Sequence, residues 1–600
     1  MPSRTAPRFS TRTAGLAAVV VALMAHGSAL AQEAAAGAPP AAGAAAPAAA
    51  STDAMTNLIR LLVAQGTITK ANGDALLQQA QGEADAARAR MAVVTPPAPP
   101  PVPEGGVRVS RVPEAVRAQI RDELRNEIMQ QAASEGWVTK GQAAPEWTKR
   151  IRLFGDVRVR SENDLYSKKN SNQILDIAAM NAQGPIDLAK AQNYLFINSR
   201  EDRVNRLRYR VRLGLEADVT KGVTAGVTLA SGDDKSPISP NSSLGGGLGK
   251  RNIWLDQAWI KVQPTDWAAL SFGRFENPFN TTELLFDNDL RFDGVAAKLN
   301  FANVLGRNSA VTLTGGAFPL DFGSADYPNA AVNKTGYPSK WLFSGELALK
   351  GEVFDDVTVK ASVGYHSFRN VQGKLSDECN MDLTNYCSTD GLVPQFLRKG
   401  NTVFTMRNHV TNSTGVYPQT FGLKFGYDIL DARLGAQFPI SDATFVKLNG
   451  DYVKNLGFKK SDICSGLFDS AQAYLVEPFN NYGSDGNTDR HVCTKTNPTS
   501  FVGGDTGYAG SLVVGSDKVD AKGSWMVGVE YRYLESDAVM DSLTDSDFHL
   551  GGTNVKGYIL SGEYAVRDGI SIGGRWMSAN EIAGEPLAID VLQIDLKARF

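Results

Sequence analysis

The sequence predicts an all-β protein, a transmembrane antiparallel β-barrel of about 16 strands preceded by a short α-helical region. Three observations support this fold class. Apolar and polar residues alternate over the last three quarters of the chain, the connections between the alternating runs are long and short in turn, and the last run ends on Phe600. With 43% apolar and 21% charged residues, the composition does not suit a chain that crosses a membrane as helices.

Residues 1–31 have the features of a secretory signal peptide. A basic stretch precedes the apolar run 14–25, and Ala29-Leu30-Ala31 is a small-residue cleavage motif. An anchoring helix is the alternative, but the apolar run is shorter than the roughly 20 residues that a span needs. The formal net charge of −3 gives no basic surface for nucleic acid.

The region that follows the signal peptide changes composition several times. Its predicted segments are an Ala/Pro-rich linker over 32–52, a helical hairpin over 53–94, a Pro-rich linker over 95–106 and an amphipathic helix over 107–148.

The predicted helix over 107–148 has one apolar stripe, formed by Val116, Ile120, Leu124 and Ile128. Such a stripe needs a partner, so the helix forms a short coiled coil with a second copy or lies against the barrel mouth. A solvated linker helix remains an alternative, and so does contact of these periplasmic helices with peptidoglycan.

Residues 149–600 are predicted to form the barrel, because a period of two places alternate side chains on opposite faces of a strand. Sixteen runs follow this pattern, among them 203–219, 419–438 and 523–540. An even number of strands is typical of bacterial barrels, and closure leaves no backbone group unpaired in lipid.

Connections after odd-numbered runs are mostly long, for example 161–202 and 277–290, whereas those after even-numbered runs are short, for example 220–222 and 566–568. In bacterial barrels the short turns lie in the periplasm. We therefore expect an outer-membrane location, surrounded by lipid, with the N-terminal region and the C-terminus in the periplasm.

The last run alternates Leu592, Ile594, Leu596 and Ala598 with polar residues and ends on Phe600. A final strand with an apolar row and a terminal aromatic residue looks like the signal that outer-membrane barrels present to the barrel-assembly machinery. Phe600 is therefore predicted to be that assembly signal.

A barrel of this size is wide enough to leave an aqueous channel, so residues on its inner face decide what passes. The predicted inner face of two strands carries a row of arginines, and the third long connection carries carboxylates that face them across a narrowing. Alternatively, the arginines only pair with Asp156, Glu216 and Asp218 on neighbouring strands. The predicted wall residues are Arg158, Arg160, Arg206, Arg208, Arg210 and Arg212, and the predicted loop residues are Glu276, Glu283, Asp287, Asp289 and Asp293.

The four cysteines, Cys379, Cys387, Cys464 and Cys493, all fall in two long connections. An even number of cysteines in an exported chain favours disulfides. We expect Cys379 to pair with Cys387 and Cys464 with Cys493, one of three connectivities. A zinc site is the alternative, although no CxxC pair is present.

Sequence motifs for catalysis are missing. The chain after residue 31 has only four histidines, and HExxH does not occur. We therefore expect no catalytic residues, no cofactor and no metal site.

Several segments resemble a known family, the proteobacterial outer-membrane proteins usually called putative porins. These segments are GRFENPF at 273–279, TDSDFHLGGTNVKGY at 544–558, RWMSANEI at 575–582, PLAIDVLQIDLKARF at 586–600 and EDRVNRLRYRVRLGLEADV at 201–219. The opening LIRLLVAQGTITKANGDALL at 58–77 is also similar to that family.

The resemblance implies a general or weakly selective porin for small hydrophilic solutes. With it we expect a homotrimer that gives passive diffusion of solutes and ions. A structural tether, in which the barrel anchors while the N-terminal helices reach cell wall or a periplasmic partner, is the alternative function.

Overall fold

The computed structural model describes most of the chain from residue 148 onward. The described ranges are 148, 150–306, 308–326, 336–353, 356–380, 386–410, 418–463, 477–482 and 501–600. The predicted signal peptide, both linkers, the helical hairpin and nearly all of the amphipathic helix lie outside these residues.

Sixteen long antiparallel strands in the described part of the chain form one closed sheet, which confirms the predicted fold class. Strand β1 pairs with β3 on one side and with the last strand, β23, on the other, so the sheet has no free edge. The sixteen are β1 (Ile151–Tyr166), β3 (Arg203–Thr220), β4 (Val223–Ser231), β6 (Ile253–Thr265), β7 (Ala268–Glu276), β8 (Arg291–Ala302), β9 (Ala310–Asp321), β10 (Lys340–Glu352), β11 (Thr358–Arg369), β17 (Tyr427–Ser441), β18 (Thr444–Asn455), β19 (Thr506–Gly515), β20 (Trp525–Leu534), β21 (Val555–Arg567), β22 (Ile570–Glu581) and β23 (Ala588–Arg599).

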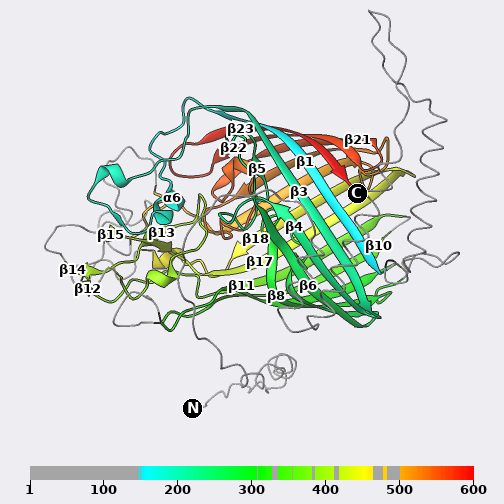
Figure 1. The fold of residues 1–600 in the computed structure, drawn as a ribbon, viewed down its shortest axis with the longest axis horizontal. Coiled ribbons are helices and arrows are strands. Elements are labelled where there is room, and N and C mark those ends of the chain that lie inside the picture. The colour runs from blue at the N-terminus through cyan, green and yellow to red at the C-terminus, as the bar shows by residue number, and fades with distance from the viewer. Residues whose placement is uncertain are drawn as a thin grey trace, which may run out of the picture. The chain divides into compact units, whose positions relative to one another are not determined.

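The short elements lie in the long connections, and α6, β12, β13, β14 and β15 gather at one end of the barrel (Figure 1). They are α6 (Ile177–Ala182), the 3-10 turns η1 (Ala191–Asn193), η2 (Asp390–Leu392), η3 (Lys460–Asp462) and η5 (Phe548–Leu550), and the strands β2 (Ile186–Asp187), β5 (Ser242–Ser243), β12 (Cys379–Asn380), β13 (Val403–Thr405), β14 (His409–Val410), β15 (Pro418–Gln419) and β16 (Phe421–Leu423). Among the described residues, no helix is both long and apolar enough to cross a membrane.

The two faces of the barrel have opposite character. On β23, Ile594 and Leu596 are 50% and 51% exposed, whereas Gln593 and Asp595 are 1% and 5% exposed. Apolar side chains thus point outward and polar ones inward, as in a barrel whose outer face meets lipid.

Tight turns close the other end of the barrel. Gly222 and Gly569 end the two-residue turns 221–222 and 568–569 with φ of +76° and +71°. Only glycine adopts this left-handed conformation without steric cost, so these turns reverse the chain at once.

Phe600 lies at the seam where the barrel closes. Its backbone exchanges two hydrogen bonds with Gly155 of β1, with N···O distances of 3.0 and 3.1 Å. A side chain at Gly155 would collide with the Phe600 ring, so the last residue packs directly on the first strand.

Two predicted strands are too long at their loop ends. The run 419–438 enters the barrel only at Tyr427, because Phe421–Leu423 pairs with Val403–Thr405 outside it. The run 523–540 leaves the barrel at Leu534, because Asp537 and Asp541 turn into the protein and are buried there by hydrogen bonds to residues 401 and 402.

The opposite character of the two faces predicts the cost of a charge in lipid. Replacing Leu213, which is 43% exposed near the middle of β3, by Arg should lower the free energy of unfolding by about 2–4 kcal/mol. Thr224→Arg places the same charge on the inner face beside Asp218 and should cost much less. Denaturant unfolding in lipid vesicles measures both, and an equal loss for the two variants would contradict the assigned faces.

Candidate functional site

Six arginines lie on the inner wall of two adjacent strands. Four half-buried arginines occupy alternate positions of β3, whereas Leu207 and Val211 between them are exposed: Arg206, Arg208, Arg210 and Arg212. The β1–β3 register sets Arg158 opposite Arg210 and Arg160 opposite Arg208. Like charges in directly opposed positions repel one another, so this arginine ladder requires carboxylates nearby. The ladder consists of Arg158, Arg160, Arg206, Arg208, Arg210 and Arg212.

Carboxylates of the wall itself neutralise part of the ladder. Asp156 lies 2.8 Å from Arg210, measured from Oδ2 to Nη2, and Glu162 lies 3.1 Å from both Arg206 and Arg208. The pairing of Asp156 with the ladder agrees with the alternative prediction that the arginines pair with acidic residues of neighbouring strands.

The two other carboxylates of that alternative lie apart from the ladder. Glu216 pairs with Arg152, and Asp218 accepts a hydrogen bond from Thr224. Pairing along the wall therefore accounts for only part of the charge of the ladder.

The connection 277–290 crosses the interior of the barrel. At one end Asn280 donates from its backbone and side-chain nitrogens to Glu346 on β10, and at the other Asp289 contacts Arg212 and Arg210 on β3, at 2.6 and 3.2 Å. Strands β10 and β3 are separated in the sheet by β9, β8, β7, β6 and β4, so the loop bridges two distant parts of the wall.

An apolar anchor holds this loop inside. Leu284, Leu285 and Phe286 are each 1% exposed, and the Phe286 ring meets the edges of Phe292 and His366 at centroid distances of 5.2 and 5.3 Å. Because these groups would be exposed to water if the loop swung out, burial of apolar surface fixes the loop in the lumen.

A second connection, 535–554, folds inward and docks on the first. Leu543 accepts a hydrogen bond from the Asp287 backbone at 2.8 Å, and Asp287 accepts one from the Ser546 backbone at 2.9 Å. From this loop Asp547 reaches Arg160 of the ladder, with an Nη1–Oδ2 distance of 2.6 Å. The two loops and the ladder therefore form one connected polar network.

Among the members of this network that sequence reasoning missed are Arg532 on β20, Arg575 on β22, and Asp545 and Asp547 in the second loop. Arg532 lies 2.7 Å from Asp545, and Arg575 lies 3.7 Å from Asp547. Both arginines occupy inward positions of predicted strands, so the same alternation that marked the ladder could have found them. The acidic residues belong to the segment TDSDFHLGG, which signalled only a family resemblance.

The environments of the first loop's carboxyl groups differ. Burial, reinforced by the negative charges of Asp545 and Glu283, raises the pKa of Asp287 to about 8. Burial and Asp545 likewise raise the pKa of Glu283 to about 7. Burial also acts on Asp289, but the guanidinium groups of Arg212 and Arg210 outweigh it and hold its pKa below the usual value.

The two remaining acidic residues predicted for the loop lie elsewhere. Asp293 is on β8 and pairs with Arg274 at 3.0 Å, with about half of its side chain exposed. Glu276 ends β7, is largely exposed, and comes no closer than 4.0 Å to Arg291. Neither contacts the ladder.

Cys379 and Cys387 form a disulfide in the connection 370–426. Cys464 and Cys493 lie outside the described residues. Within the described ranges, no cluster of three or more His, Cys, Asp or Glu side chains is arranged to hold a metal ion.

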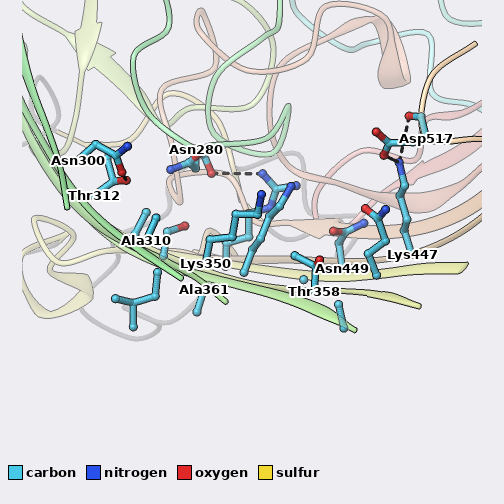
Figure 2. Close-up of a pocket in the computed structure, with 18 of the residues that line it drawn as sticks. Asn280, Asn300, Ala310, Thr312, Lys350, Thr358, Ala361, Lys447, Asn449 and Asp517 are labelled. Atoms are coloured by element: carbon cyan, nitrogen blue, oxygen red, sulfur yellow. Dashed lines mark hydrogen bonds and ion pairs between the residues drawn. The ribbon is translucent and has the colours of Figure 1, made fainter. Parts of the chain in front are cut away.

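Polar cavities lie next to both inner loops. One of about 540 Å³ is lined by Arg206, Arg208 and Glu162 and by residues of the long connections. Another cavity of about 650 Å³ lies toward the tight turns (Figure 2). It lies between the loop residue Asn280 and the inner wall formed by β8, β9, β10, β11, β17 and β18. Water-accessible space thus borders the network on both sides.

The anchor of the first loop can be tested by removing one ring. Phe286→Ala should reduce the free energy of unfolding by about 3–5 kcal/mol, the usual cost of deleting a buried Phe side chain. Asn288→Ala, at an exposed position of the same loop, should cost far less. Denaturant unfolding of the folded barrel measures both, and equal stability of the two variants would mean that the loop is not held by its apolar residues.

Comparisons with known proteins agree with this architecture. The model of a protein family described as "Putative porin" matches residues 52–600. A search of curated proteins gives no match.

Similar solved structures include the outer membrane channel DcaP of Acinetobacter baumannii, with 10% identity over 75% of this chain and 97% of that chain and a TM-score of 0.35. OprB of Pseudomonas putida has 11% identity over 76% of this chain and 95% of that chain, with a TM-score of 0.39. OmpF of Salmonella typhi has 8% identity over 75% of this chain and 97% of that chain, with a TM-score of 0.34. Because the family model covers nearly the whole sequence, this chain, an outer-membrane β-barrel, belongs to the putative porin family.

Proposed function

We propose that the barrel is a water-filled channel that passes small hydrophilic solutes and ions by passive diffusion. The observation that carries this proposal is the contact of Asp289, on a loop inside the barrel, with Arg210 and Arg212 on its wall. Inward-folded loops narrow the lumen at this level, and polar cavities continue on both sides.

Opposite charges at a narrowing create a field across the path of a solute. The arginine ladder supplies the positive side, and the carboxyl groups of the two inner loops supply the negative side. Such a field orients polar solutes and disfavours apolar ones, which cannot replace the hydration of the charges. Solute passage would therefore depend on size and polarity rather than on a tight binding site.

The surroundings of the channel follow from the sequence. We propose that residues 1–31 are removed on export, that Phe600 is read by the barrel-assembly machinery, and that the tight turns, the N-terminal region and the C-terminus face the periplasm. We propose further that three copies form a trimer and that the N-terminal helices contact peptidoglycan.

Planar-bilayer recording tests the main proposal. The purified chain should give discrete conductance steps in potassium chloride. If it inserts into the bilayer and gives no steps, the lumen is closed, and the structural tether becomes the better explanation.

Charge reversal in the ladder should change ion preference. Replacing both Arg208 and Arg210 by Glu should shift the reversal potential in a salt gradient toward that of cations. The matched control, Lys221→Glu with Lys518→Glu, makes the same change of net charge at exposed turns and should have a smaller effect, because water and salt screen those sites. Equal shifts would show that the ladder does not line the path.

Ion preference should also depend on pH. Between pH 6 and pH 9 the raised pKa values of Asp287 and Glu283 mean that both groups lose a proton, so the loop gains negative charge and preference for cations increases. Asp287→Asn should reduce this shift, whereas Asp289→Asn should retain it because Asp289 is already ionised at pH 6. Reversal potentials recorded between pH 6 and pH 9 measure this change in ion preference. If Asp287→Asn shows the same change as the unmodified protein, Asp287 is not the group that titrates.

A further inference from the structure

The cavity of about 650 Å³ toward the tight turns has a strongly basic lining. Its wall consists of inward residues of β8, β9, β10, β11, β17 and β18, and Figure 2 shows Lys350 and Lys447 extending from these strands into the space. Among the described residues that line the cavity, Asp517 is the one acidic residue. The basic lining residues are Lys298, Lys350, Lys360, Arg433 and Lys447.

Two of these cations already have acidic partners. Lys447 lies 2.7 Å from Asp517, measured from Nζ to Oδ1. Arg433 lies 3.4 Å from Asp451 and also donates to the backbone oxygen of Asn280. Their charge is therefore largely compensated within the wall.

Lys350 and Lys360 are different. The β10–β11 register sets them directly opposite each other, a position in which Cβ atoms of antiparallel strands are about 5 Å apart. Both are exposed to the cavity, and neither has an ion pair or a side-chain hydrogen bond among the described residues. Like charges in directly opposed positions destabilise a sheet, so the stability of the fold does not explain why both positions are lysine.

The neighbouring positions leave room around the pair. Across the adjacent strands, Lys350 faces Ala310 and Lys360 faces Gly435, neither of which can shield an ammonium group. The nearest inward acids of β10 form no ion pair with Lys350 or Lys360: Glu346 accepts a hydrogen bond from the neutral Asn280, and Glu352 accepts one from the neutral Asn308.

Lys298 on β8 adds a third ammonium to the same cavity; among the described residues it has no ion pair within 4.0 Å, and its charge acts on Glu346 only at longer range. Neutral hydrogen-bonding groups from Thr312, Ser362 and Asn449 complete the lining. The arrangement offers three ammonium groups without a close ion pair, and nearby polar groups, in water-accessible space. Ammonium groups on flexible side chains suit anions whose charge is spread over several oxygens.

We propose that Lys350 and Lys360, assisted by Lys298, form a binding site for small dianions such as sulfate, inorganic phosphate or dicarboxylates, inside the lumen near the tight turns. This inference rests on the proposed channel function, because the ligand reaches the site through the lumen. A site of this kind raises the local concentration of anionic solutes before they reach the narrowing.

Competition between sulfate and chloride tests the site. Chloride current through single channels is recorded while sodium sulfate is added on both sides at constant ionic strength. Sulfate should reduce the current of the unmodified protein at millimolar concentration. Lys350→Gln and Lys360→Gln should each weaken this block by roughly tenfold, the effect of losing one charge-assisted hydrogen bond.

Lys447→Gln is the matched control, because it removes one positive charge from the same cavity but leaves the pair intact. It should keep most of the sulfate block. If Lys447→Gln weakens the block as much as Lys350→Gln, the effect is a general field and the site is refuted. Absence of any sulfate block in a conducting channel refutes it as well.

A second measurement separates this inference from the channel proposal. Sulfate should raise the unfolding temperature of the detergent-solubilised protein more than chloride at equal ionic strength, and Lys350→Gln with Lys360→Gln should lose this difference. If the protein gives no conductance but keeps the sulfate-specific shift, only the channel proposal fails. If conductance is present and neither block nor shift is found, only the anion site fails.

Discussion

Pairing of backbone hydrogen-bonding groups in hydrocarbon is the constraint on which this structure depends. A sheet in lipid has no water to satisfy its edge, so β1 must pair with β23 as well as with β3. Closure creates an interior that lipid cannot enter. Charged side chains that would be costly on the outer face, such as the six arginines of β1 and β3, are then placed on the inner face.

The interior has its own constraint, which is the balance of charge. The ladder is neutralised by carboxylates from its own strands, from β23 and from the two inner loops, so the loops are held by ion pairs on one side and by the Phe286 cluster on the other. Lys350 and Lys360 stand outside this balance. The same wall therefore combines a closely ion-paired region at the narrowing with a lysine-rich region near the tight turns, where two opposed lysines lack a close ion pair.

The barrel was predictable because alternation with period two is a local property of the sequence. The number of strands, the sides of the long and short connections and the inward arginines all follow from it. Contacts between loops are not local. The docking of 535–554 on 277–290 depends on Asp287 meeting Ser546 across the lumen, and nothing near either residue indicates the other. For the same reason the sequence predicted Glu276, Asp293 and Asp289 alike as loop carboxylates that face the ladder. Glu276 and Asp293 instead belong to the strands β7 and β8, which hold them away from the ladder.

The Arg160 contacts have a consequence for assembly. Arg160 stands on the first strand, and its carboxylate partners, Asp595 and Asp547, come from the last strand and the last long inner loop. Until β1 meets β23 and the last inner loop, this guanidinium has neither of these partners. Closure of the seam and neutralisation of these charges therefore occur together, so an open barrel would carry unpaired charge of opposite sign on the two edges of its seam.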